Sequence, residues 1–141
     1  MILAALLLSA AAPADPCAWS APSPPRRMKG VFVNEFEAQR FYEVTIVGEI
    51  APRTPFSWLD RDAAEQPATM SPWPRGHVFE VELIGVERFA PASASDLSPP
   101  CAPTNGERSA IRAIRAIRIV SQRDLGVVNE ILPTRRSHLS R

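Results

Sequence analysis

The stretch His77-Val-Phe-Glu-Val-Glu-Leu-Ile-Gly-Val-Glu-Arg-Phe89 carries the clearest indication of the fold. Within it, Phe79, Val81 and Leu83 alternate with two glutamates. Alternation with a period of two is typical of a strand with one buried face and one hydrated face. Further apolar residues blur the alternation at both ends: Val78, Ile84 and Val86. This blurring predicts a central strand or a bulge near Gly85.

Other segments on either side of this strand also favour β-structure. Residues 30–36 and 40–47 are rich in β-branched and aromatic side chains, and shorter strands are expected around 56–59 and 127–132. The intervening residues 34–40 could equally form a helical turn, because their periodicity does not separate the two states.

The segment 109–120 is the most ambiguous. Ile111, Ile114 and Ile117 recur every three residues, a spacing that fits neither a helix nor a strand. The isoleucines favour a strand and the interspersed alanines favour a helix. We expect a strand here and keep a helix as the alternative.

The composition as a whole points to a mostly β protein. Fifteen prolines against six glycines disfavour long helices, since proline removes a backbone donor and clashes with the preceding turn. About five strands separated by long proline-rich loops fit a small antiparallel barrel or a curved sheet, in which closure protects the strand edges. An OB-like barrel is one instance of this class.

The chain divides into four parts by composition. Residues 1–14 form an apolar run that ends in Ala12-Pro13-Ala14, the pattern of a signal peptide cleaved before Asp15, although a buried N-terminal helix is an alternative. A proline-rich extended lead-in at 15–28 precedes a single β-rich domain at 29–132. A basic tail at 133–141 is expected to be disordered. No segment is long and apolar enough for a membrane span.

Two cysteines, Cys17 and Cys101, are expected to form a disulfide if the protein is exported. Closing so long a loop would contribute up to roughly 4 kcal/mol in the chain-entropy model. The alternative is a pair of unrelated thiols in a cytosolic protein.

Several short motifs occur along the chain: Phe36-Glu37-Ala38-Gln39-Arg40-Phe41, Trp58-Leu59, Gly76-His77 and Val86-Glu87-Arg88. In these motifs the chain resembles small uncharacterised exported (periplasmic) proteins of proteobacteria. The resemblance implies export and a β-rich fold. It implies no activity, because none is assigned to such proteins.

The sequence contains no assembled catalytic set. It has two histidines, His77 and His138, and His77 has the opposite strand parity to the nearby Glu80 and Glu82, which disfavours a metal site. The pairs Glu35 and Glu37, and Glu80 and Glu82, are more typical of a solvated strand face than of a glycosidase. No Gly-x-Ser-x-Gly elbow or phosphate-binding glycine loop is present. We therefore assign no catalytic residue, no metal and no cofactor.

The aromatic residues are the best candidates for ligand binding. Trp58 and Phe56 lie in one proline-flanked segment, and Trp73 lies in Ser71-Pro-Trp-Pro74. Rigid segments that present indole rings can stack on sugars or peptides. The more common alternative is that each tryptophan plugs one end of the core.

Charge patterning narrows the class of partner. The net charge is +1, which gives no overall attraction for nucleic acid, although arginines are frequent from Arg108 onward. An envelope glycan, a peptide or an anionic surface is the expected partner. We therefore expect a non-enzymatic exported binding or structural protein of the cell envelope, with a small envelope hydrolase that uses carboxylates as the alternative.

Overall fold

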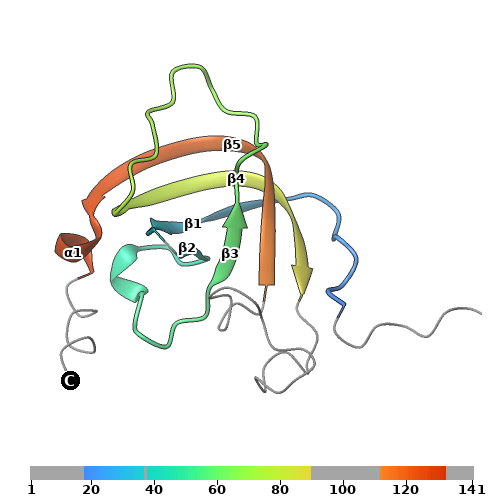
Figure 1. The fold of residues 1–141 in the computed structure, drawn as a ribbon, viewed down its shortest axis with the longest axis horizontal. Coiled ribbons are helices and arrows are strands. Elements are labelled where there is room, and N and C mark those ends of the chain that lie inside the picture. Colours follow the sequence, from blue (N-terminus) through green and yellow to red (C-terminus); the bar gives the residue numbers. More distant parts are fainter. Residues whose placement is uncertain (1–17, 37, 90–111, 133–141) are drawn as a thin grey trace, which may run out of the picture.

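The structure is a computed structural model that describes residues 18–36, 38–89 and 112–132. Its elements are β1 (Arg26–Asn34), β2 (Gln39–Tyr42), the 3-10 helix η1 (Val47–Glu49), β3 (Ser57–Asp60), β4 (His77–Phe89), β5 (Arg112–Val127) and α1 (Val128–Ile131). Figure 1 shows long, curved β4 and β5 beside β1, with the shorter β2 and β3 completing the sheet. The five strands close into a barrel in the order β1-β2-β3-β5-β4.

A mostly β fold of about five strands, as a small barrel or a curved sheet, was predicted from the sequence; the structure confirms the β fold and shows the barrel. The pairing is not wholly antiparallel, because β3 and β5 run parallel, with Trp58 beside Ala113 and Leu59 beside Ile114. Five strands in a closed ring cannot all alternate in direction. One parallel pair is therefore a consequence of closure, and the barrel is mixed.

The strand predicted at 77–89 is β4. Phe79, Val81 and Leu83 are buried and Glu80 is exposed, as the alternation predicted. The register against β5 shifts at three places, one of them between Ile84 and Gly85. Gly85 suits this site because a Cβ there would lie 2.9 Å from the carbonyl oxygen of Arg115.

The ambiguous segment is a strand, and the helical alternative is wrong for its described part. Strand β5 begins at Arg112 and continues to Val127, well beyond the predicted end. The last strand, predicted at 127–132, is wrong: Val128–Ile131 form the short helix α1. Gly126, at φ 116°, lets the chain leave the sheet, and Val128 and Leu132 then pack onto the outside of the barrel.

Two hydrophobic clusters stabilise the barrel. The interior cluster contains Met28, Phe32, Phe41, Leu59, Phe79, Val81, Leu83, Ile114, Ala116 and Ile119. The loop 61–76, which rises above β4 and β5 in Figure 1, packs Ala64, Met70 and Trp73 against it. The outer cluster gathers Val31, Val33, Tyr42, Val78, Val128 and Leu132. Because β1 contributes to both clusters, its sequence is apolar on both faces rather than alternating.

The predicted second strand is shorter than expected, because β2 ends at Tyr42 and the chain then turns into η1. Val44, Val47 and Ile50 of this region pack on the outer cluster instead of extending the sheet. In the stretch 34–40, where a helical turn was the alternative, β1 ends at Asn34 and β2 starts at Gln39. Between the two strands the amide of Glu35 donates to the carbonyl oxygen of Ala38 at 3.1 Å.

The proline-rich lead-in runs along the end of β4. The amides of Ser20 and Ser23 donate to the carbonyl oxygens of Phe89 and Glu87 at 2.9 Å and 2.8 Å, and both serine hydroxyls accept from the β4 backbone. The first strand already starts at Arg26, three residues before the predicted domain start.

Several sequence predictions lie outside the described residues. They are the signal peptide at 1–14, the tail at 133–141 and both cysteines, Cys17 and Cys101. In the described part of the chain, no helix has the length and apolarity needed to cross a membrane.

Candidate ligand-binding site

A groove beside Trp58 is the main candidate site. It has a volume of about 580 Å³ and is lined by residues of β2, β3, β4, β5 and the lead-in. We call it the Trp58 groove; its lining residues are Pro22, Gln39, Trp58, Asp60, Asp62, Val86, Arg88, Ala113, Ile114 and Arg115.

Strand alternation on β3 positions the tryptophan. Ser57 and Leu59 are buried, whereas Trp58 is half-buried and Asp60 is exposed. Trp58 therefore lies on the outer face of the sheet, opposite the interior residue Leu59. Its neighbour on β5 is Ala113, whose small side chain leaves room beside the indole ring.

The indole of Trp58 makes no ring contact, cation–π contact or hydrogen bond with any residue that the structure describes. An indole N–H normally finds a partner when it is enclosed in a protein. Trp58 is therefore an aromatic side chain whose stacking and hydrogen-bonding capacity is not used within the described fold.

Trp73 serves instead as a plug for the core. Its ring meets Phe32 edge-on at 5.6 Å and Phe79 at 5.0 Å, and its Nε1–H donates to Gln66 at 2.9 Å. The buried side chain of Asn34 fastens this segment by donating to the carbonyl oxygen of Trp73 at 3.1 Å. Trp73 therefore packs against the core, which was the alternative to ligand binding for this residue.

Phe56 also has partners within the fold. Its ring lies 5.9 Å from that of Tyr42, and the guanidinium of Arg40 stands 5.1 Å from its centroid. It packs on the outer cluster and lines a separate depression that includes Glu43 and Arg112. The three aromatic residues proposed as a binding set thus occupy three different surroundings, and only Trp58 lines the groove.

Four charged side chains line the Trp58 groove, two negative and two positive. Asp60 and Asp62 carry the negative charges, and Arg88 and Arg115 carry the positive charges. Arg88 donates from Nε to the carbonyl oxygen of Ser20 at 2.9 Å, whereas Arg115 has no ion-pair partner in the described ranges. Sequence reasoning missed these residues because β3, β4 and β5 bring them together from distant parts of the chain.

A second polar cluster, the Glu43 network, lies at the same end of β4 as the groove, because its Glu87 stands between Val86 and Arg88 in the strand. Arg26 and Arg112 each bind both Glu43 and Glu87, and Arg112 also donates from Nε to the hydroxyl oxygen of Ser57 at 2.6 Å. The hydrogen bonds from Arg26 lower the pKa of Glu43 more than its partial burial raises it. All the charges in the network are paired, which favours a structural role.

The strongest arrangement for acid–base chemistry is the pair of His77 and Asp124. The Nδ1 atom of His77 lies 2.9 Å from one carboxylate oxygen of Asp124. Partial burial raises the pKa of Asp124, but hydrogen bonds from His77 and from the amide of Gly126 outweigh this and lower it. No serine or cysteine is hydrogen-bonded to the ring of His77 among the residues described, so a nucleophile for this base is missing there.

The paired glutamates are engaged in surface ion pairs. Glu80 accepts from Arg123 at 2.5 Å, and Glu82 binds Arg27 and lies 3.7 Å from Lys29. The hydrogen bond from Arg27 lowers the pKa of Glu82. Within residues 18–36, 38–89 and 112–132, no three histidine, cysteine or acidic side chains converge to hold a metal ion.

Comparison with known proteins found no matching family model, curated protein or solved structure.

Proposed function

We propose that the protein is an exported, non-catalytic binding protein of the cell envelope, and that it binds a glycan across the Trp58 groove. The observation that carries this proposal is the unengaged indole of Trp58 in a groove of about 580 Å³. The two other candidate aromatic residues, Trp73 and Phe56, make ring contacts with neighbouring residues of the fold.

The groove supplies the two kinds of contact that a sugar requires. An indole face packs against the apolar C–H face of a pyranose ring, and flanking polar groups fix its hydroxyls. Asp60, Gln39 and Arg115 offer a carboxylate acceptor, an amide and a guanidinium donor within the same groove. Small five-stranded barrels of the OB type bind oligonucleotides or oligosaccharides on the face of their second and third strands, the strands that contribute Gln39 and Trp58 here.

The charge balance of the groove favours a neutral ligand. Two carboxylates and two guanidinium groups give no net charge among these lining residues. A nucleic acid requires a basic track for its phosphates and would be repelled by Asp60 and Asp62. The same repulsion disfavours an anionic surface, so a neutral glycan fits better than either.

A carboxylate-dependent hydrolase remains the alternative with less support. A glycosidase needs one carboxylic acid whose pKa is raised, so that it can donate a proton. The described carboxylates with a shifted pKa, namely Glu43, Glu82 and Asp124, have it lowered. Glu43 and Glu82 form ion pairs with arginines, and Asp124 is hydrogen-bonded to His77.

The decisive experiment is co-sedimentation with insoluble glycans: peptidoglycan sacculi, chitin and cellulose. We expect one of them to retain the wild-type protein, and Trp58→Ala to weaken that binding by about tenfold or more. Phe36→Ala is the matched control, because Phe36 is 78% exposed but does not line the groove. Equal binding by wild type and Trp58→Ala, or retention on none of the glycans together with binding to peptides, would contradict the proposal.

A further inference from the structure

Arg61 occupies an unusual position at the covered end of the barrel. It follows β3 directly, and its guanidinium carbon lies 4.8 Å from the ring centroid of Trp73 and 5.6 Å from that of Phe32. Phe32 belongs to the interior cluster, and Trp73 packs over that cluster from the loop 61–76. A half-buried cation therefore lies against the aromatic wall of the barrel mouth.

This cation has no ion-pair partner in the part of the chain that the structure describes. Its Nε atom is buried and has no hydrogen-bond partner, and no carboxylate lies within ion-pair distance of the guanidinium. Burial lowers the pKa of Arg61, and the nearby charge of Asp62 opposes this only in part. By contrast, the half-buried Arg26 and Arg112 are each paired with two carboxylates.

An unpaired charge withdrawn from water is unfavourable, and its attraction to two rings offsets only part of the cost. A methionine could fill the same space without that cost. A buried polar atom without a hydrogen-bond partner is expected mainly at functional or strained sites, and a bound ion is one of the partners that can satisfy it.

The outer end of the guanidinium is accessible. Among the atoms of Arg61, only Nε is both buried and unpartnered, so Nη1 and Nη2, which also lack partners here, retain contact with solvent. A planar guanidinium presents its two terminal nitrogens as a fork that matches two oxygens of a carboxylate or phosphate group.

We propose that Arg61 is the recognition group of an oxyanion site at the mouth of the barrel, where it binds a carboxylate or phosphate group through Nη1 and Nη2. Trp73 and Phe32 hold the guanidinium in place from behind. The site is separate from the Trp58 groove, whose lining does not include Arg61. It does not depend on the proposed glycan function.

The test uses the indole N–H signal of Trp73 in a ¹⁵N-labelled full-length protein, assigned with Trp19→Phe and Trp58→Phe. Sodium phosphate and sodium acetate are titrated separately, with sodium chloride keeping the ionic strength constant. We expect a saturable shift of the Trp73 signal, since the bound anion perturbs the cation stacked on this ring. Saturation by phosphate alone indicates a phosphate-bearing ligand, saturation by acetate alone a carboxylate, and saturation by both a general oxyanion site.

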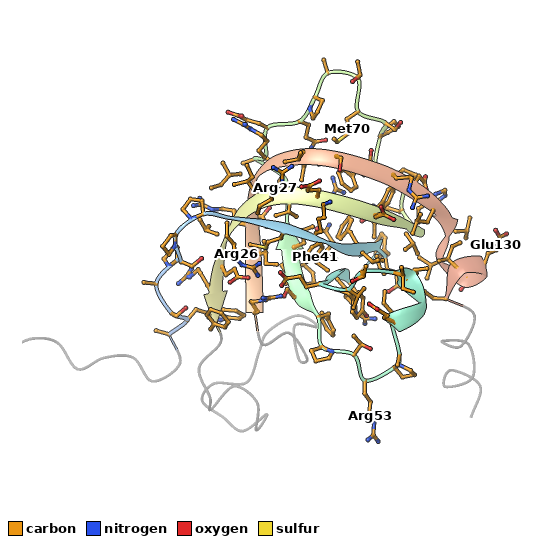
Figure 2. The ribbon with its side chains drawn as sticks, turned by 180° about the vertical axis from the view of Figure 1, so that it is seen from behind. Arg26, Arg27, Phe41, Arg53, Met70 and Glu130 are labelled. Atoms are coloured by element: carbon orange, nitrogen blue, oxygen red, sulfur yellow. The ribbon has the colours of Figure 1, made fainter. Side chains whose placement is uncertain are left out.

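Three variants complete the test. Arg61→Met should lose the saturable shift, and Arg61→Lys, which keeps the charge but not the fork, should weaken binding several-fold. Arg53→Met should behave like wild type, since Figure 2 shows Arg53 extending into solvent from the loop before β3. Trp58→Ala should also retain the shift, which separates this site from the glycan site.

A titration that is the same in wild type and in Arg61→Met or Arg61→Lys would overturn the proposal. So would a shift that sodium chloride reproduces, because it would report ionic strength alone. If Arg61 had a purely structural role, Arg61→Met would lower the melting temperature, and the size of this decrease would not depend on phosphate or acetate.

Discussion

Glu80 and Val81 are adjacent on β4 but lie in opposite surroundings. Val81 is 2% exposed within the interior cluster, and its neighbours there are other apolar side chains. Glu80 points to solvent and pairs with Arg123 at 2.5 Å. The alternation of the strand thus places Val81, whose burial stabilises the barrel, next to Glu80, which contributes little to its stability.

Val81→Asp should destabilise the protein by about 3 kcal/mol or more, because an unpaired carboxylate would enter an apolar interior. Glu80→Lys removes one exposed ion pair and sets a lysine opposite Arg123, which should cost only about 1 kcal/mol or less. Urea unfolding of the two variants measures the difference. Equal losses of stability would show that the two faces of β4 are wrongly assigned.

At the level of single residues, the sequence predicts burial better than it predicts partners. Period-two alternation was enough to assign Phe79, Val81 and Leu83 to the interior. It could not reveal that Arg61 and Trp73 meet, because their contact depends on how the loop 61–76 folds back over the barrel. The same holds for the groove: Trp58 was identified as a candidate from its aromatic character, whereas Arg115 reaches it only through strand pairing.

Among the elements, β1, β4 and β5 are joined at one end by the Glu43 network. Arg26 comes from β1, Glu87 from β4 and Arg112 from β5, while Glu43 follows β2 directly. Ser57, at the start of β3, accepts a hydrogen bond from Arg112. One cluster therefore contacts all five strands or their ends, and its protonation should affect the stability of the sheet as a whole.

The Glu43 network predicts a pH-dependent stability. Since the pKa of Glu43 is lowered in the folded state, its contribution is fully present above the unfolded-state pKa of about 4.3 and is lost as the pH falls through the folded value. Glu43→Gln should be less stable than wild type by about 1 kcal/mol near neutral pH. This difference should shrink below about pH 4.

Urea unfolding of wild type and Glu43→Gln from neutral to acidic pH measures this trend. Glu130→Gln is the matched control, because Glu130 on α1 points away from the barrel in Figure 2 and has no ion pair with the residues described. Its stability should follow that of wild type throughout. An advantage of wild type over Glu43→Gln that stays constant in acid would contradict the role of the network.

Element boundaries were predictable where a single period dominates. Strand β4 has such a period, whereas the three-residue repeat at the start of β5 has none, so only pairing with β4 on one edge and β3 on the other fixes it as a strand. Helix α1 was predicted as a strand because Val127, Val128 and Ile131 have β-favouring side chains. Its apolar residues are instead needed to cover the outside of the barrel, and tertiary packing overrides their propensity.

For the molecule as a whole, the proline content and the strand count were sufficient to predict a small barrel with long loops. The parallel pair was not predicted, although it follows from closing an odd number of strands. The proline-rich lead-in is held to the sheet by hydrogen bonds, because Ser20 and Ser23 fasten it to β4. Any cross-link at Cys17 would therefore reinforce an attachment that exists without it.

The last prediction concerns the mature chain, which we expect to begin at Asp15 after export and to carry a disulfide between Cys17 and Cys101. Intact mass spectrometry of protein from its native host, with and without a thiol-alkylating reagent, tests both statements together.

The bond should contribute less than its entropic limit of roughly 4 kcal/mol, because a proline-rich chain is already stiff when unfolded. Reduction should then lower the melting temperature while the barrel stays folded, since the two hydrophobic clusters pack the described strands together. Ser20→Ala with Ser23→Ala should make protease cleavage of the lead-in far more sensitive to reduction. An intact Met1 or two alkylated cysteines would refute the corresponding part of the prediction.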